Sequence, residues 1–226
     1  MVEANRKQQF LQRITERLNR PRPRQVTPPD LAPWDNHSEE TKADRVGRFS
    51  EEAEQAGAEV RMVRDEQSLR KLIDSDLKKD GFKKVLTWKE TAPLLEGTEG
   101  IQVCIWEPDR DRMAQLREAE QSDVGLVRAE WGLAFTGTLV LWNDEKRGRG
   151  RAVSLLPPVL YVVLDADHIA SRMFPVLKKI ENKNKMVSCL NFITGPSRTS
   201  DIENDLSLGV HGPGRVQIYV VEKAGV

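Results

Sequence analysis

The sequence predicts an α/β fold built on a mostly parallel, buried central sheet. Short apolar runs of strand length alternate with amphipathic segments of helical length, which is the pattern of βαβ crossovers. The clearest runs are Lys84–Trp88, Ile101–Trp106 and Leu160–Leu164. Runs this continuously apolar are typical of strands that are covered on both faces. The 226 residues are also enough to bury a large core.

The N-terminal region predicts a helical arm followed by a linker. Apolar side chains recur on one face of a helix over residues 4–19, and basic side chains outnumber acidic ones around it. A cluster of prolines then ends the helix. We therefore assign residues 1–38 to an amphipathic helix with a proline-rich linker, and residues 39–226 to the α/β domain. The arm either docks on a partner or rests on the domain as a solvated helix.

From residue 39 onward, helices and strands are expected in turn. The expected strands cover residues 58–63, 84–88, 101–106, 160–164 and 215–221, with two more apolar runs within residues 124–142. The expected helices cover residues 39–57, 69–77, a polar segment around Met113 and Leu116, and a segment from Asp165 to Ile180. Pro175 should kink or restart the last of these helices.

Charge and composition exclude several classes of function. Lys and Arg number 35, as do Asp and Glu, so the balanced charge argues against a general nucleic-acid or membrane-surface binder. No apolar run is long enough to cross a bilayer and no secretory signal is recognisable, which predicts a cytoplasmic protein without a transmembrane segment. Cys104 and Cys189 lie in apolar stretches and are expected to be reduced core residues. No metal-binding spacing is present, so we expect no metal and no cofactor in this chain.

The segment from Asn191 to Glu203 contains the first candidate ligand site. Its apolar half predicts a strand, and Ser200 with Glu203 three residues later forms a capping box that predicts the start of a helix. A helix N-terminus favours anions, and the guanidinium of Arg198 suits a carboxylate or phosphate. The alternative is a well-capped turn with Arg198 in a surface salt bridge. The candidate anion-binding residues here are Thr194, Gly195, Ser197, Arg198 and Thr199.

Three further positions are candidates for chemistry. Gly137 stands between Thr136 and Thr138, so the backbone could approach a ligand beside two hydroxyl donors, or the segment could be a turn or bulge. Glu130 is an acid in an apolar stretch, either a catalytic group or a paired core group. His211 lies in a loop between glycines, where it could exchange a proton or simply bond a carbonyl.

A charged loop over residues 143–151 is the last candidate. It contains Lys146, Arg147, Arg149 and Arg151 together with glycines. The loop is either a solvated turn or a basic rim over an anionic site.

Four motifs, taken together, resemble the lactate utilization protein C family (LutC, also called YkgG), whose shared unit is the LUD domain. The motifs are Gly132-Leu-Ala-Phe-Thr-Gly-Thr-Leu-Val-Leu, Ser154-Leu-Leu-Pro-Pro, Phe192-Ile-Thr-Gly-Pro-Ser-Arg-Thr-Ser-Asp-Ile-Glu and Gly209-Val-His-Gly-Pro. The resemblance covers roughly residues 40–226. It implies a layered fold of the NagB/ribose-5-phosphate isomerase/CoA-transferase type.

The resemblance also implies a role in the oxidation of L-lactate to pyruvate, which allows growth on lactate. The expected partners are lactate utilization proteins A and B, with iron–sulfur clusters in a partner. The resemblance assigns no catalytic residue to this chain. The chain departs from the family at Phe135, where many members carry Glu, and this weakens any mechanism that uses a carboxylate at that position.

Three functions remain open at this point. As a non-redox subunit of a lactate-oxidising complex, the chain would hold a small carboxylate on Arg198, with His211 as proton acceptor, and electrons would leave through the partner. A regulatory or assembly module is the second. The third is a CoA-transferase-like or cyclo-ligase-like enzyme with Glu130 as nucleophile or acid. The fold alone does not decide between them.

Overall fold

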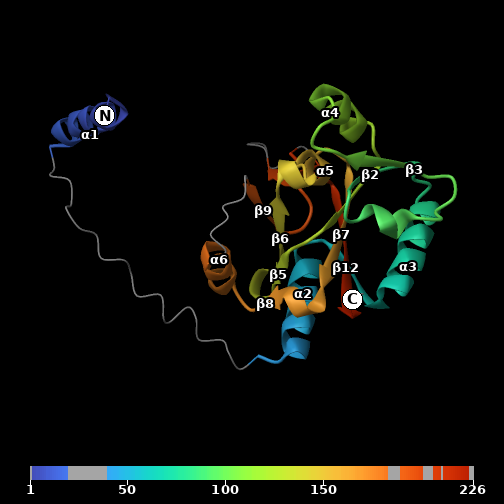
Figure 1. Ribbon diagram of the computed structural model, residues 1–226. Coiled ribbons are helices and arrows are strands. Elements are labelled where there is room, and N and C mark those ends of the chain that lie inside the picture. Colours follow the sequence, from blue (N-terminus) through green and yellow to red (C-terminus); the bar gives the residue numbers. More distant parts are fainter. Residues whose placement is uncertain (1, 20–39, 183–188, 201–205, 210, 224–226) are drawn as a thin grey trace. The chain divides into compact units, whose positions relative to one another are not determined.

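The computed structural model describes residues 2–19, 40–182, 189–200, 206–209 and 211–223 (Figure 1). The chain forms two compact units, residues 1–36 and 37–226. The first contains α1 (Val2–Leu18), the helix that the sequence predicts. The expected boundary at residue 38 lies outside the described residues.

The second unit is built on a six-stranded sheet whose pairings are all parallel. Its strands are β1 (Glu59–Asp65), β2 (Lys84–Trp88), β3 (Gln102–Trp106), β4 (Val124–Arg128), β7 (Val159–Asp165) and β12 (Arg215–Lys223). The strand order is β1-β12-β7-β4-β2-β3. Helices α3 (Glu66–Lys79) and α4 (Arg112–Glu120) form crossovers between parallel strands. The predicted α/β class with a mostly parallel sheet is confirmed.

The strand β7 shows why the sheet is buried on both faces. Leu160, Val162 and Leu164 belong to one hydrophobic cluster, whereas Tyr161 and Val163 belong to another. Successive side chains of a strand point to opposite faces, so each face of the sheet has its own core. This explains the continuous apolar run in the sequence.

One face of the parallel sheet is covered by α3. Asp65 begins this helix by accepting a hydrogen bond from the backbone of Ser68, at 2.8 Å. Leu69, Ile73 and Leu77 are fully buried against the sheet.

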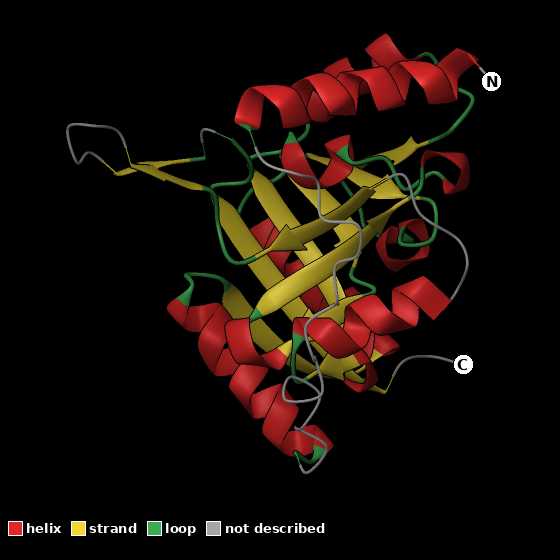
Figure 2. Ribbon diagram, turned by 90° about the vertical axis from the view of Figure 1, so that its left-hand side faces the viewer, coloured by secondary structure: helices red, strands yellow, loops and turns green. Residues whose placement is uncertain are grey.

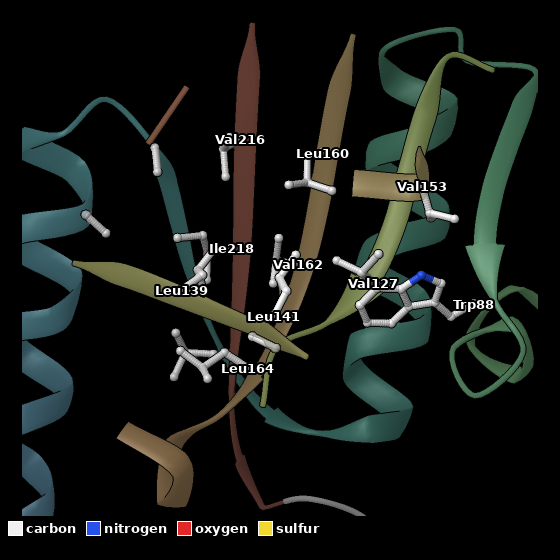
Figure 3. Packing of buried hydrophobic residues seen from close by; sticks show 14 of the residues in the cluster. Trp88, Val127, Leu139, Leu141, Val153, Leu160, Val162, Leu164, Val216 and Ile218 are labelled. Atoms are coloured by element: carbon white, nitrogen blue, oxygen red, sulfur yellow. The ribbon is translucent and has the colours of Figure 1, made fainter. Parts of the chain in front are cut away.

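A second, smaller sheet covers the other face. Its strands are β5 (Trp131–Leu133), β6 (Thr138–Asn143), β8 (Ile169–Ala170) and β9 (Cys189–Ile193), in the order β8-β5-β6-β9. Figure 3 shows β6 crossing the parallel strands, with Leu139 and Leu141 packed over Val162 and Ile218.

The remaining helices complete the layers. Helices α2 (Lys42–Gln55) and α5 (Ala152–Leu155) share the core between the sheets, and α6 (Met173–Asn182) packs on Trp131 and Trp142 of the second sheet. Short 3₁₀ turns are η2 (Ala92–Leu95), η3 (Ala134–Thr136), η4 (Glu145–Arg147) and η5 (Ala166–His168). Among the described helices, none combines the length and the apolar character that a bilayer crossing requires.

The helix predicted from Asp165 begins later than expected. The strand β7 continues to Asp165, and Ile169 pairs with Gly132 in the second sheet. Helix α6 begins only at Met173, which places Pro175 in its first turn, where a missing N–H is tolerated. The prediction was wrong because tertiary pairing in the second sheet overrides the helical spacing of Ile169.

The helix predicted to begin at Ser200 is also wrong. Residues Arg198–Ser200 form β10, which pairs antiparallel with β11 (Leu206–Leu208). This two-stranded ribbon stands away from the two sheets (Figure 2). A capping box contributes about 1 kcal/mol, so a strand partner can override it. Glu203 lies outside the described residues.

Candidate functional site

The predicted anion-binding stretch lies at the edge where the parallel strands begin. The backbone N–H of Ser197 donates to the carbonyl of Pro213 at 2.8 Å, just before β12. Gly195, with φ +70°, packs against the carbonyl of Ala56, shortly before β1. Ligands of open α/β sheets bind beyond the carboxyl ends of the strands. The stretch is therefore at the edge opposite to the usual one.

The structure brings several of the predicted residues of this stretch together. The backbone N–H of His211 donates to the hydroxyl of Ser197 at 3.3 Å. Across the hairpin, Thr199 pairs with Ser207. The guanidinium of Arg198 lies against the backbone of Gly57, whose φ of +92° is a conformation that favours glycine.

The threonine hydroxyls form one chain of hydrogen bonds. Thr138 lies 2.7 Å from Thr136 and 2.8 Å from Thr194, measured between hydroxyl oxygens. Gly137 has φ +59°, and a Cβ there would collide with the backbone of Ala53 in α2. Gly137 therefore allows helix α2 to pack closely against the backbone at this position.

Phe135 takes part in a different contact. Phe135 is 43% exposed, and the centroid of its ring lies 5.1 Å from the guanidinium of Arg48 and 4.2 Å from that of Arg172. Cation–π attraction of this kind stabilises an exposed aromatic side chain.

Glu130 lies at the opposite edge, where the parallel strands end. Its carboxylate is 3.1 Å from Arg149, which is also 2.7 Å from Glu90. Burial alone would lower the pKa of the Arg149 guanidinium. Glu90 and Glu130 stabilise its charged form more strongly, so the pKa is raised. The structure thus places Glu130 in an ion pair, and its catalytic role stays a prediction. Because His211 precedes β12, the two catalytic candidates lie at opposite edges of the sheet.

Two tryptophans hold the charged loop over residues 143–151. Trp88 donates from Nε1 to the carbonyl of Gly150 at 3.0 Å. Gly150 packs against the indole of Trp106 and leaves no room for a Cβ. Asp144 and Arg149 exchange backbone hydrogen bonds of 2.9 and 3.1 Å, which closes the loop. The loop is therefore a fixed feature beside the carboxyl ends of β2 and β3.

A cleft of about 360 Å³ lies on one side of this loop, and we call it the arginine cleft. Arg112, Asn143, Arg151 and Cys189 contribute its polar lining, with Trp106 and leucines completing the wall. Neither Arg112 nor Arg151 has a carboxylate partner in the part of the chain that the structure describes.

A second cleft, of about 540 Å³, lies on the other side of Trp106. Its lining contains four cations, Lys89, Arg110, Lys146 and Arg147, together with the acids Glu107 and Asp109. Arg110 binds Glu118 at 2.7 Å, and Arg147 lies 3.4 Å from Asp144. The arginine cleft is the better candidate for an anion, because its lining contains two arginines and no acid, and the described residues offer neither arginine an ion pair.

The two cysteines are free and occupy different environments. Cys104 is buried, as predicted, and burial raises the pKa of its thiol. Cys189 is half-buried and faces the arginine cleft, so it is not a simple core residue. In the described residues, no group of three or more His, Cys, Asp or Glu side chains is arranged to hold a metal ion.

Comparison with known proteins identifies the family. The sequence profile of the LUD domain matches residues 46–221. The chain belongs to the LUD domain family.

Relatives support this assignment, and one solved structure shares the fold. "Lactate utilization protein C" of Halalkalibacterium halodurans is 31% identical, covering 96% of this chain and 98% of that protein. The protein of the same name from Shouchella clausii is 29% identical, covering 94% and 96%. A DUF162 family protein from Deinococcus radiodurans has a TM-score of 0.58 at 23% identity, covering 81% of this chain and 99% of that structure. This last likeness shows the fold.

The LUD domain includes both edges of the sheet and the arginine cleft, but not α1. The sequence pointed to Arg151 through its basic loop. It gave no signal for Arg112 or Asn143, since each looks like an ordinary polar residue until the fold places it beside Arg151.

Proposed function

We propose that this chain is a component of a lactate utilization system in the cytoplasm. In this system it supports the oxidation of L-lactate to pyruvate together with lactate utilization proteins A and B, one of which carries iron–sulfur clusters. The observation that carries the proposal is similarity over nearly the whole chain to relatives named lactate utilization protein C.

The chain's own part in the reaction is to hold a carboxylate rather than to carry electrons. Oxidation of lactate to pyruvate releases two electrons and two protons, so an electron acceptor is required. Iron–sulfur clusters are held by about four thiolates, whereas this chain has 2 cysteines. In this proposal the electrons therefore pass to the clusters of the partner. The arginine cleft supports the binding role, because guanidinium groups suit carboxylates.

The ion pair of Glu130 weighs against an independent enzyme of the CoA-transferase or cyclo-ligase type. Such an enzyme would need a carboxylate that is available to attack an activated group. The Glu130 carboxylate is instead engaged by Arg149 at 3.1 Å.

The test is lactate-dependent dye reduction by purified lactate utilization proteins A and B, with and without this chain. We expect the rate to collapse when the chain is left out and to return when it is added back. Equal rates without the chain would overturn the proposal and leave an assembly or regulatory role.

A further inference from the structure

We propose that helix α1 is a docking helix for the iron–sulfur protein of the proposed lactate-oxidising system. A row of apolar side chains on α1 would enter an apolar groove on that protein, and the arginines beside the row would face one acidic wall of the groove. The choice of partner rests on the proposed function, in which that protein must approach this chain to accept electrons. The chemistry of the docking surface rests on the helix itself.

The first observation is the row of exposed apolar side chains. Phe10, Ile14 and Leu18 follow one another at intervals of four residues, so they share one face of the helix. They are 63%, 39% and 53% exposed. A helix of 17 residues gains most of its stability by packing such a face against another surface. Anchors at this spacing are typical of a helix that binds in a groove.

Three arginines form a ridge along one side of this row. Arg6 lies four residues before Phe10, and Arg13 lies three residues after it. Arg17 lies three residues after Ile14 and four after Arg13. Side chains at these spacings are neighbours on a helix. All three arginines are exposed, and none has an ion pair among the described residues, so the ridge fits an acidic surface.

The other sides of α1 favour a protein groove over a membrane. Beyond the row, on the side away from the arginines, come Leu11 and then Gln8 and Thr15, which carry no charge. Gln12 and Glu16 lie opposite the row and share a hydrogen bond of 3.2 Å. Helices that bind anionic membranes carry Lys and Arg on the polar face. Positive charge on one side, with an acid on the polar face, instead fits a groove that has one acidic wall.

The sequence comparisons separate α1 from the LUD domain. The domain profile begins at residue 46, well after this helix. The relative from Halalkalibacterium halodurans nevertheless matches 96% of this chain, so too few residues remain outside the match to include the whole helix. At least part of α1 is therefore shared with a lactate utilization protein although it is no part of the domain. This is expected of a segment that serves a partner of that system.

The test is binding of the full chain to purified lactate utilization proteins A and B, measured by biolayer interferometry. We expect the wild type to bind the protein that carries iron–sulfur clusters. Phe10→Gln and Ile14→Gln should each weaken this binding by about 10- to 100-fold, the range for a central apolar anchor. Arg13→Gln combined with Arg17→Gln should weaken it by about 3- to 10-fold at low ionic strength and by less at high ionic strength.

Glu16→Gln is the matched control, because it changes a charge next to Arg17 in the sequence but lies opposite the apolar row. It should bind like the wild type, and circular dichroism should show that all variants keep their helix content. The inference is overturned if the wild type does not bind the iron–sulfur protein, or if Phe10→Gln and Ile14→Gln bind like Glu16→Gln.

Two further measurements test other occupants of the row. Binding of the wild type to vesicles of equal parts phosphatidylcholine and phosphatidylglycerol, or self-association that Phe10→Gln abolishes, would overturn the inference in favour of a membrane or a second copy of the chain. The dye-reduction assay tests the proposed function separately. Dye reduction that requires the chain but is unchanged by Phe10→Gln and Ile14→Gln would overturn the docking role of α1 and leave the proposed function intact.

Discussion

The two edges of the parallel sheet differ in how their sequence relates to their structure. The edge where strands begin has the clearest motif, Gly195-Pro196-Ser197-Arg198, yet its glycine serves close packing against Ala56. The edge where strands end has weak local motifs, but it gathers the ion pairs of Arg149 and lies beside the arginine cleft. A strong local motif can therefore arise because a backbone conformation and close packing require glycine. A cluster of charged side chains, in contrast, is assembled from segments far apart in the sequence.

The largest expected effect tests whether the first edge is structural. Gly195→Ala should destabilise the domain by about 2–4 kcal/mol, because it combines a left-handed backbone with a collision against the Ala56 carbonyl. Urea unfolding measures this loss. Gly212→Ala is the control, since its Cβ would meet Ser197 at an ordinary 3.5 Å. Equal stability of both variants would contradict the packing role.

The second prediction asks which edge holds the ligand. Arg151→Gln should weaken lactate binding by about 10- to 100-fold, whereas Arg198→Gln should leave it nearly unchanged. Calorimetry on both variants gives the comparison directly. The opposite result, with the loss on Arg198→Gln, would move the site to the edge where Ser197 and His211 meet.

A third prediction concerns the acid at the second edge. Glu130→Gln removes one of two carboxylates from Arg149, so the free energy of unfolding should fall by about 1 kcal/mol. The rate in the dye-reduction assay should be almost unchanged. A general acid or base contributes about 100-fold or more, and a loss of that size would show that Glu130 is catalytic after all.

The smallest expected effect is on cysteine labelling. Cys189 faces the cleft, whereas Cys104 is buried with a raised thiol pKa, so an alkylating reagent should modify Cys189 first near neutral pH. Cys104 should become more reactive as the pH rises, because its thiolate fraction increases. Saturating L-lactate should slow the labelling of Cys189 and leave Cys104 unchanged. Mass spectrometry of the labelled peptides measures both rates, and equal protection of both cysteines would argue for a general change in the fold instead.

Much of the fold could be predicted from the sequence, because the strands of a buried parallel sheet are apolar on both faces. The expected runs at residues 84–88 and 160–164 correspond to β2 and β7. The second sheet could be predicted only in part: the apolar runs within residues 124–142 and from Asn191 contain β5, β6 and most of β9, but nothing indicated β8. The strand β8 has only two residues, Ile169–Ala170, and is defined by its pairing with β5 rather than by its own pattern.

The candidate site could likewise be predicted only in part from the sequence. The basic character of residues 143–151 could be seen in the sequence. The sequence did not show that Arg149 pairs with two acids, whereas Arg151 has no ion pair among the residues that the structure describes. Arg112 reaches the cleft through the crossover after β3, and Cys189 through the second sheet. Local patterns carry no information about such contacts between distant segments.

By itself, the sequence determined the parallel sheet, most of its helices and the resemblance to the LUD family, because hydrophobic periodicity and backbone-specific residues are local properties. Only the tertiary structure decided that residues 198–200 form a strand, that Glu130 and His211 lie at opposite edges, and that Arg112, Asn143 and Arg151 line one cleft. These outcomes depend on pairing and packing between segments far apart in the chain, and the energies of such contacts exceed the local preferences on which a sequence pattern depends.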